Sequence, residues 1–206
     1  MTKNEKDMLK FFDTKNIYYN FMLSSLFITA YDLLKNSIIS QIESFYTNGF
    51  DQSGYIISKE YQTKVLALDP KKNKLQASLL WLMSYNVITE EDKNKFEKIK
   101  CQRNLLAHET INFLIDSEKE IDTNLFVDIK NLLKKIDQWF VLEVELTTDP
   151  DMTKEEYDSI DRENVQSMRM LYLDYLMGII FGNPEEYENV FKEFKNTIYA
   201  KYGDKF

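Results

Sequence analysis

Hydrophobic residues recur every three or four positions along most of this chain, which is the spacing of helices that bury one face. The first stripe predicts a long helix over about residues 16–46, which Asn48 and Gly49 are expected to end. A second stripe predicts a helix over about 71–86. The stripe residues are Phe21, Ile28, Tyr31, Leu34, Ile38, Ile42 and Phe45 in the first helix and Leu75, Leu79, Leu82 and Met83 in the second.

A third helix is predicted from Thr89 to about Ile115. Thr89 is a typical N-cap, and three acids follow it in the first turn, where the helix dipole stabilises negative charge. A fourth helix, over about 125–140, has the clearest amphipathic pattern of the chain. Its stripe consists of Leu125, Ile129, Leu132, Ile136 and Trp139, flanked by Phe126, Leu133 and Phe140.

Two stretches are not covered by these helices. Residues 50–70 combine a turn at 51–54, a short apolar run at 55–57 and a short helix that ends near Leu68. Residues 147–151, Thr-Thr-Asp-Pro-Asp, form the best candidate boundary. Beyond it, Gly182 is expected to end one helix and Asn183-Pro184 to begin the last. The apolar stripe of the first helix is Val165, Met168, Tyr172, Tyr175, Leu176 and Ile179. The stripe of the last helix is Tyr187, Val190, Phe191, Phe194 and Ile198.

These elements predict an all-α protein. We expect an antiparallel helical bundle over 14–146 and a C-terminal helical hairpin within 150–206 that packs on the bundle. The composition agrees, because five glycines and three prolines are too few for a sheet-rich protein with many tight turns. The aromatic residues of the tail are better explained by core packing than by stacking on bases, because they alternate with aliphatic residues at helical spacing.

Several features favour a cytoplasmic location. The single cysteine, Cys101, excludes an internal disulfide and suits a reducing compartment. The first residues are charged and lack the apolar core of a secretion signal. The longest apolar run, 21–34, is interrupted by polar residues and is too short to span a bilayer. We therefore expect no association with a membrane.

The charge pattern narrows the choice of partners. A net charge of −8 argues against duplex DNA, because neutralised phosphates supply most of that affinity. The charge is uneven: 71–103 holds eight basic and four acidic residues, whereas 143–163 holds nine acidic and two basic residues. A solvated helix face explains each cluster on its own. The basic cluster becomes informative because it leads into Arg103.

The stretch Arg103-Asn104-Leu105-Leu106-Ala107-His108 carries the most chemistry, and it contains the only histidine of the chain. In helical projection Arg103 lies near the middle of an apolar side. A guanidinium keeps its charge, so it needs an anionic ligand, a carboxylate such as Glu97, or an interface that opens onto a cleft. The apolar side is formed by Phe96, Ile99, Leu106, Ala107, Ile111 and Leu114.

Arginine and histidine together suit RNA cleavage without a metal. Histidine can serve as general base or acid near neutral pH, and the arginine fork can hold phosphate oxygens. His108 lies about 140° around the helix from Arg103. Either the long arginine side chain closes part of this gap, or two copies of the helix contribute both residues to one cleft of a symmetric dimer, which we favour. One histidine and one cysteine are too few for a zinc site, so we expect no metal and no cofactor.

At these residues the chain resembles the HEPN superfamily. The hallmark of that family is an arginine, usually followed by a polar residue, and a histidine four to six positions further on. The resemblance covers Tyr18 to about Phe140. It implies a metal-independent endoribonuclease with Arg103 and His108 catalytic and Asn104 supporting. It also implies a homodimer formed through the motif helix, an RNA substrate, and a toxin or phage-defence role with an antitoxin or regulatory protein. The chain departs from the family at Thr110, where a tyrosine is common.

The chain is also similar to the mannitol-repressor family. The shared layout is a long first helix with Phe11-Phe12 near its start, a leucine-rich helix at 79–82, the turn 87–91 and then the motif helix. This second resemblance implies a non-catalytic regulatory or interaction module, in which the motif serves folding or dimerisation.

Overall fold

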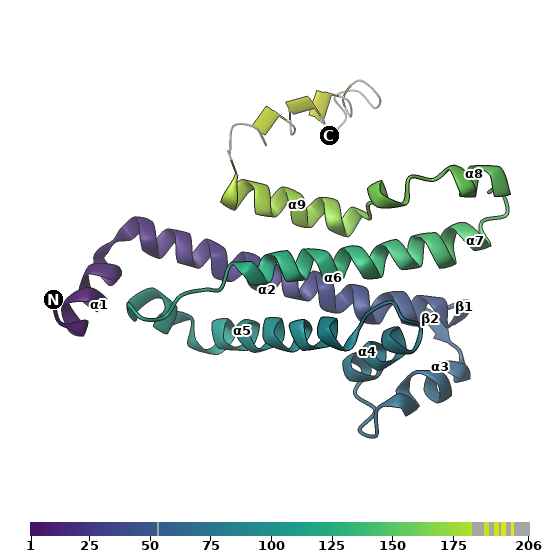
Figure 1. Cartoon of the computed structure of the whole chain (residues 1–206), viewed down its shortest axis with the longest axis horizontal. Helices are drawn as coiled ribbons and strands as arrows, with labels where there is room; N and C mark the ends of the chain where they lie inside the picture. Colours follow the sequence, from purple (N-terminus) through teal and green to yellow (C-terminus); the bar gives the residue numbers. More distant parts are fainter. Residues whose placement is uncertain (53, 183–187, 190–191, 194, 197–198, 200–206) are drawn as a thin grey trace.

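The computed structural model describes residues 1–52, 54–182, 188–189, 192–193, 195–196 and 199. It is an all-α helical bundle, as predicted, and it also contains one small β-hairpin that was not predicted (Figure 1). The long helix α2 (Thr14–Phe45) runs along the whole bundle, and the Asp13 carboxylate caps it by accepting from the amides of Lys15 and Asn16. Its buried face includes Leu23, Phe27, Leu34, Ile38 and Ile42.

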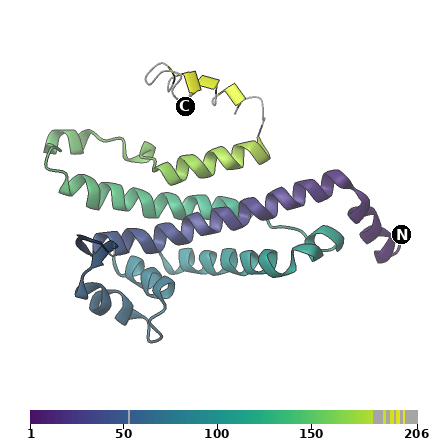
Figure 2. The same ribbon diagram turned by 180° about the vertical axis from the view of Figure 1, so that it is seen from behind.

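Helices α5 (Glu90–Ile115) and α6 (Asn124–Phe140) pack lengthwise on α2. Figures 1 and 2 show α5 running antiparallel to both α2 and α6. The three helices share one core, in which Phe27 of α2 meets Phe126 of α6 edge to face, with ring centroids 5.1 Å apart. The clear amphipathic pattern of α6 therefore corresponds to burial against both neighbours.

The short helix α4 (Lys74–Ser84) closes the core near the C-terminal end of α2, and it follows α3 (Lys59–Lys64) and a 3₁₀ turn (Leu66–Leu68). Trp81 of α4 is buried there, and its indole donates to the hydroxyl of Tyr46 at 3.3 Å. The burial of Trp81 against Tyr46 explains why the leucine-rich helix predicted over 71–86 forms at nearly the predicted place.

A two-stranded antiparallel hairpin includes the short apolar run expected at 55–57, for which no strand was predicted. It consists of β1 (Thr47–Asp51) and β2 (Gly54–Ile57). The expectation that Asn48 and Gly49 end the first helix is wrong, because α2 ends at Phe45 and these two residues lie in β1. The backbone of β1 pairs with that of β2, which contains the apolar run 55–57. The register of this pairing shifts by one residue between Thr47 and Gly49.

An additional helix, α1 (Lys3–Phe12), precedes the bundle and was not predicted. Thr2 and Glu5 form its capping box. Phe11 and Phe12 therefore end α1 instead of opening the long helix, which corrects the layout expected from the mannitol-repressor resemblance. None of the residues of α1 is buried, but the spacing of Thr2 and Glu5 is a sequence signal for a helix start that was overlooked.

The C-terminal part begins where α6 continues through a π-helical stretch (Val141–Glu145) into α7 (Leu146–Thr148). A short helix α8 (Lys154–Ser159) and a 3₁₀ turn (Arg162–Asn164) lead to α9 (Met168–Phe181). Gly182 is the C-cap of α9, as predicted, and α9 packs on α2 and α6. The predicted start of the last helix, 183–187, and several of its stripe positions lie outside the described residues.

In the part of the chain that the structure describes, we find no helix with both the length and the apolar character needed to cross a membrane.

Candidate functional site

The helix that carries the motif is anchored at its first turn. Thr89 and Asp92 form a capping box, and the Lys135 ammonium of α6 binds the Asp92 carboxylate at 2.7 Å. Burial alone raises the pKa of Asp92, but the hydrogen bonds from Lys135 and Thr89 outweigh it, and the pKa lies below its ordinary value of 3.8. This buried, charged anchor fixes α5 against α6 far from the motif itself.

Arg103 is half-buried between α5 and α2. Its guanidinium carbon lies 5.4 Å from the centroid of the Tyr31 ring, and its Nη1 donates to the Oδ1 of Asn104 at 3.3 Å. Its Nε is buried and has no hydrogen-bond partner among the described residues. Burial raises the pKa of the Tyr31 hydroxyl, and the nearby positive charge of Arg103 opposes that rise.

The intramolecular carboxylate considered for Arg103 does not pair with it. Glu97 instead binds Lys100 on the same helix at 3.1 Å, and within the described part of the chain no ion pair to Arg103 is found. A partly desolvated guanidinium thus keeps an unsatisfied donor beside an aromatic ring. Such a group favours an incoming anion.

His108 is exposed, and over the described residues its imidazole forms no hydrogen bond or ion pair. Asn104, one helical turn earlier, is also exposed. A hydrogen bond thus joins Arg103 to Asn104. In the described part of the chain, His108 forms no hydrogen bond with either of them. Arg103 faces the aromatic core of its own bundle and His108 faces outward.

The helix bends directly after His108. Glu109 has φ −125° and ψ 27°, which are not helical values, so α5 consists of two straight segments. The Thr110 hydroxyl donates to the carbonyl of Leu106, a back-bond that accompanies bending in helices. The Glu109 carboxylate accepts from Lys119 at 2.7 Å and from Asn112 at 3.1 Å. The sequence pattern does not predict this bend, since Lys119 comes from the following loop.

The apolar stripe of the motif helix is narrower than predicted. Phe96, Ile99 and Leu106 are buried, but Ala107 is exposed and Ile111 is 56% exposed, so the expectation that both lie on the buried side is wrong. Together with Leu105, which is 41% exposed, Ile111 leaves apolar surface around the exposed Asn104 and His108.

Three of the eight basic residues in the basic cluster of the sequence are paired with acids on their own helix. Lys93 pairs with Glu90 at 3.4 Å, Lys95 with Glu91 at 2.9 Å and Lys100 with Glu97 at 3.1 Å. These spacings of three and four residues are typical solvated ion pairs. The simpler interpretation of that cluster, a solvated helix face, therefore applies to these three lysines.

One buried polar site was not predicted. Asp137 of α6 is 1% exposed and accepts hydrogen bonds from Ser37 and Gln41 of α2 and from Ser167, the N-cap of α9. The guanidinium of Arg169 lies 3.5 Å from it. The signal was present in the sequence, because an aspartate four residues after Leu133 falls on the buried stripe of α6. This carboxylate ties the C-terminal part to the bundle.

No group of three or more His, Cys, Asp and Glu side chains arranged to hold a metal ion is found among the described residues. Comparisons of the chain with family models, with curated proteins and with solved structures give no match. The two family resemblances therefore rest on the motif and the layout alone.

Proposed function

We propose that this protein is a metal-independent endoribonuclease of the HEPN type, with a role as a toxin or in phage defence. The observation that carries the proposal is Arg103: a half-buried guanidinium with an unsatisfied Nε and no carboxylate partner in the described part of the chain. A phosphate oxygen supplies the missing acceptor and the missing charge at once.

The proposed site is shared between two copies of the chain. In one copy Arg103 lies against Tyr31 of the bundle and His108 is exposed, which supports a site in which the two residues come from different copies. The exposed side chains of Leu105 and Ile111 offer apolar contact area for a second motif helix. In a two-fold arrangement His108 of one copy approaches Arg103 of the other.

The chemistry needs only proton transfer and charge stabilisation. One imidazole removes the proton of a ribose 2′-hydroxyl, and the oxygen forms a bond to the adjacent phosphorus. The bond from phosphorus to the 5′-oxygen breaks, and the imidazole that took up the proton gives it to that leaving oxygen. The products are a 2′,3′-cyclic phosphate and a free 5′-hydroxyl. Arg103 stabilises the charge on the phosphorane oxygens, and Asn104 holds the guanidinium.

The test is cleavage of tRNA and total RNA by purified protein in the presence of EDTA. Wild-type protein should cleave, and His108→Ala and Arg103→Ala should each lower the rate about a hundredfold or more, the scale of lost acid–base catalysis. Arg162→Ala is the matched control, because Arg162 is half-exposed in the C-terminal part and pairs with Glu143. Absence of cleavage, or equal cleavage by all variants, rejects the proposal.

A second candidate function is a non-catalytic regulatory module, as the mannitol-repressor resemblance implies. The contact between Arg103 and Tyr31 favours it, since it gives the arginine a role within the fold. The effect of Arg103→Ala on the free energy of unfolding distinguishes the two functions. For a catalytic Arg103, Arg103→Ala changes the free energy of unfolding by no more than about 1 kcal/mol, the value of one cation–π contact. A larger loss, or loss of self-association without any cleavage by wild type, supports the regulatory module.

A further inference from the structure

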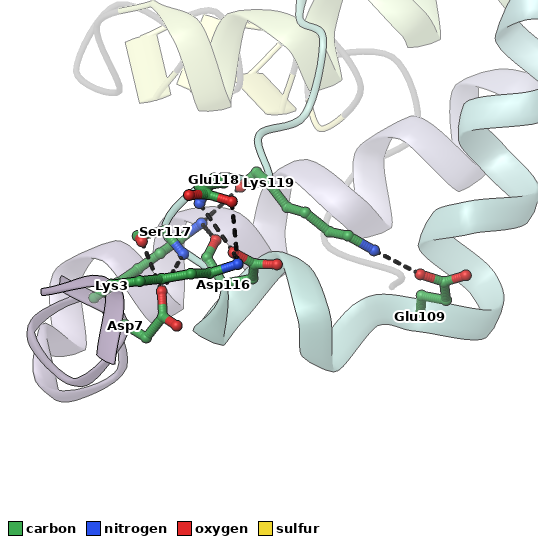
Figure 3. A network of polar contacts seen from close by, with 8 residues as sticks. Lys3, Asp7, Glu109, Asp116, Ser117, Glu118 and Lys119 are labelled. Carbon is green, nitrogen blue, oxygen red and sulfur yellow. Dashed lines mark hydrogen bonds and ion pairs between the residues drawn. The ribbon is translucent and has the colours of Figure 1, made fainter. Parts of the chain in front are cut away.

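Helix α1 is held against the bundle by polar contacts. Met8, Leu9 and Phe12 of α1 are 60–70% exposed, and none of its residues is buried. Helix α1 is attached to the loop that follows α5 (Figure 3). Asp7 accepts from the backbone amide and the hydroxyl of Ser117 at 2.8 and 2.6 Å.

Two lysines of α1 complete this attachment. Lys10 donates to the carbonyl oxygens of Asp116 and Lys119 at 2.8 and 2.7 Å. Lys3 pairs with Glu118 at 3.1 Å and with Asp116 at 3.4 Å. Each contact ends on the loop 116–119, so the loop is held in a defined position by α1. We call this set of contacts between α1 and residues 116–119 the clamp.

The clamped loop reaches back to the bend beside His108. Lys119 extends along α5 to bind Glu109, the bent residue, and its ammonium also lies 5.9 Å from the ring centroid of buried Phe113. Figure 3 shows this side chain spanning from the loop to α5. Lys119 therefore connects the clamp to both sides of the bend.

The bend determines what surrounds the imidazole. In a straight helix the residue four positions after His108, Asn112, lies beside it on the same face. With Glu109 in a non-helical conformation the next turn is redirected, and the Asn112 amide binds Glu109 instead. His108 consequently stands exposed at the end of the first segment of α5.

We propose that Glu109 and Lys119 are positioning residues for His108, and that α1 holds them in place through the clamp. The pair keeps α5 bent, and the bend keeps the imidazole open to a substrate. This inference rests on the proposed function for its consequence in catalysis. Its structural content, the dependence of the surroundings of His108 on Lys119 and α1, can be tested without any RNA.

The sole histidine makes the structural test direct, because the protein has one set of imidazole NMR signals. Lys119→Met keeps the length of the side chain and removes its charge. We expect its imidazole signals to shift and a stronger NOE to appear between His108 and Asn112, as α5 straightens. The clamp variants Lys10→Ala and Asp7→Asn should move the signals in the same direction by a smaller amount. Lys95→Ala, which breaks a comparable ion pair on the same helix, should leave them unchanged.

Exchange of the two charges provides the rescue. The double variant Glu109→Lys with Lys119→Glu should restore the wild-type imidazole signals, whereas Glu109→Lys alone should not. If the variants cleave RNA, kcat should fall on the order of tenfold to a hundredfold in Lys119→Met with little change in KM. Unchanged imidazole signals in Lys119→Met overturn the inference. A wild-type protein without RNA cleavage rejects the proposed function, yet these NMR results still decide the positioning role.

Discussion

At the scale of single residues, two buried polar groups behave in opposite ways. The Asp137 carboxylate is fully enclosed and satisfied by donors from α2 and α9, whereas the Arg103 Nε is buried without a partner. Buried polar groups in folded proteins are nearly always hydrogen-bonded. Asp137 therefore fits a structural role. Arg103 shares the lack of a partner with the buried hydroxyls of Ser24 and Ser78, but of these three groups among the described residues Arg103 alone carries a charge.

Replacement of Asp137 should show how strongly its network holds the C-terminal part. Asp137→Ala leaves the donors of Ser37, Gln41 and Ser167 without their acceptor, and we expect the free energy of unfolding to fall by about 3 kcal/mol. Urea denaturation followed by circular dichroism measures the change. Asp137→Asn keeps one acceptor and should cost less, and the exposed Asp158→Ala should have almost no effect. If Asp137→Ala lowers the free energy of unfolding by less than Asp158→Ala does, the structural role of Asp137 is contradicted.

At the scale of elements, strong stripes predicted helices well. The helices predicted over 71–86 and 125–140 form at Lys74–Ser84 and Asn124–Phe140, because burial of a stripe drives both the pattern and the helix. What could not be predicted depends on contacts distant in sequence. Helix α1 buries no residue and is attached by polar contacts to the loop 116–119.

In the candidate site, too, helical spacing predicts some features, whereas others depend on contacts between residues distant in sequence. The position of Arg103 on the inner side of α5 could be predicted from helical spacing, and the structure indeed places it over Tyr31. The bend at Glu109 could not, and the Glu109 carboxylate there binds Lys119 from the next loop, a contact that helical spacing does not reveal. The exposure of Ile111 was also missed, and with it part of the apolar surface beside His108.

Acid should weaken the attachment of α1. Hydrogen bonds from Ser117 lower the pKa of Asp7, the Glu118 amide and Lys3 lower that of Asp116, and Lys119 lowers that of Glu109. Carboxylates with depressed folded pKa values stabilise above their ordinary values of 3.8 to 4.5 and lose that contribution as the pH falls through the depressed values. We therefore expect α1 to remain attached at pH 5 and to detach below about pH 4.

Amide NMR signals of α1 report this detachment when the pH is lowered stepwise, with signals of α6 as the internal reference. The clamp includes the exposed ion pair between Lys3 and Glu118, which added salt screens, so salt at neutral pH should also weaken the attachment of α1. If the signals of α1 change only together with those of α6, the helix detaches by global unfolding, and the polar clamp is not a separate unit.

At the scale of the whole molecule, the shared site makes a prediction that a site within one chain does not. Arg103→Ala and His108→Ala should each be inactive alone, but a heterodimer of the two keeps one cleft with an intact Arg103 from one copy and an intact His108 from the other. Free exchange of an equal mixture yields half heterodimers, in each of which one of the two Arg103–His108 pairs of the shared cleft is intact, so about a quarter of the wild-type cleavage rate should return.

Light scattering after size-exclusion chromatography should first establish a dimer for wild-type protein. Ile111→Asp places a charge on the exposed apolar surface beside the motif, so it should yield monomers and should abolish both wild-type cleavage and complementation. A mixture that stays inactive although the two variants exchange subunits contradicts a shared site. In that case the guanidinium and the imidazole have to meet within one chain, which requires Arg103 to leave the Tyr31 ring.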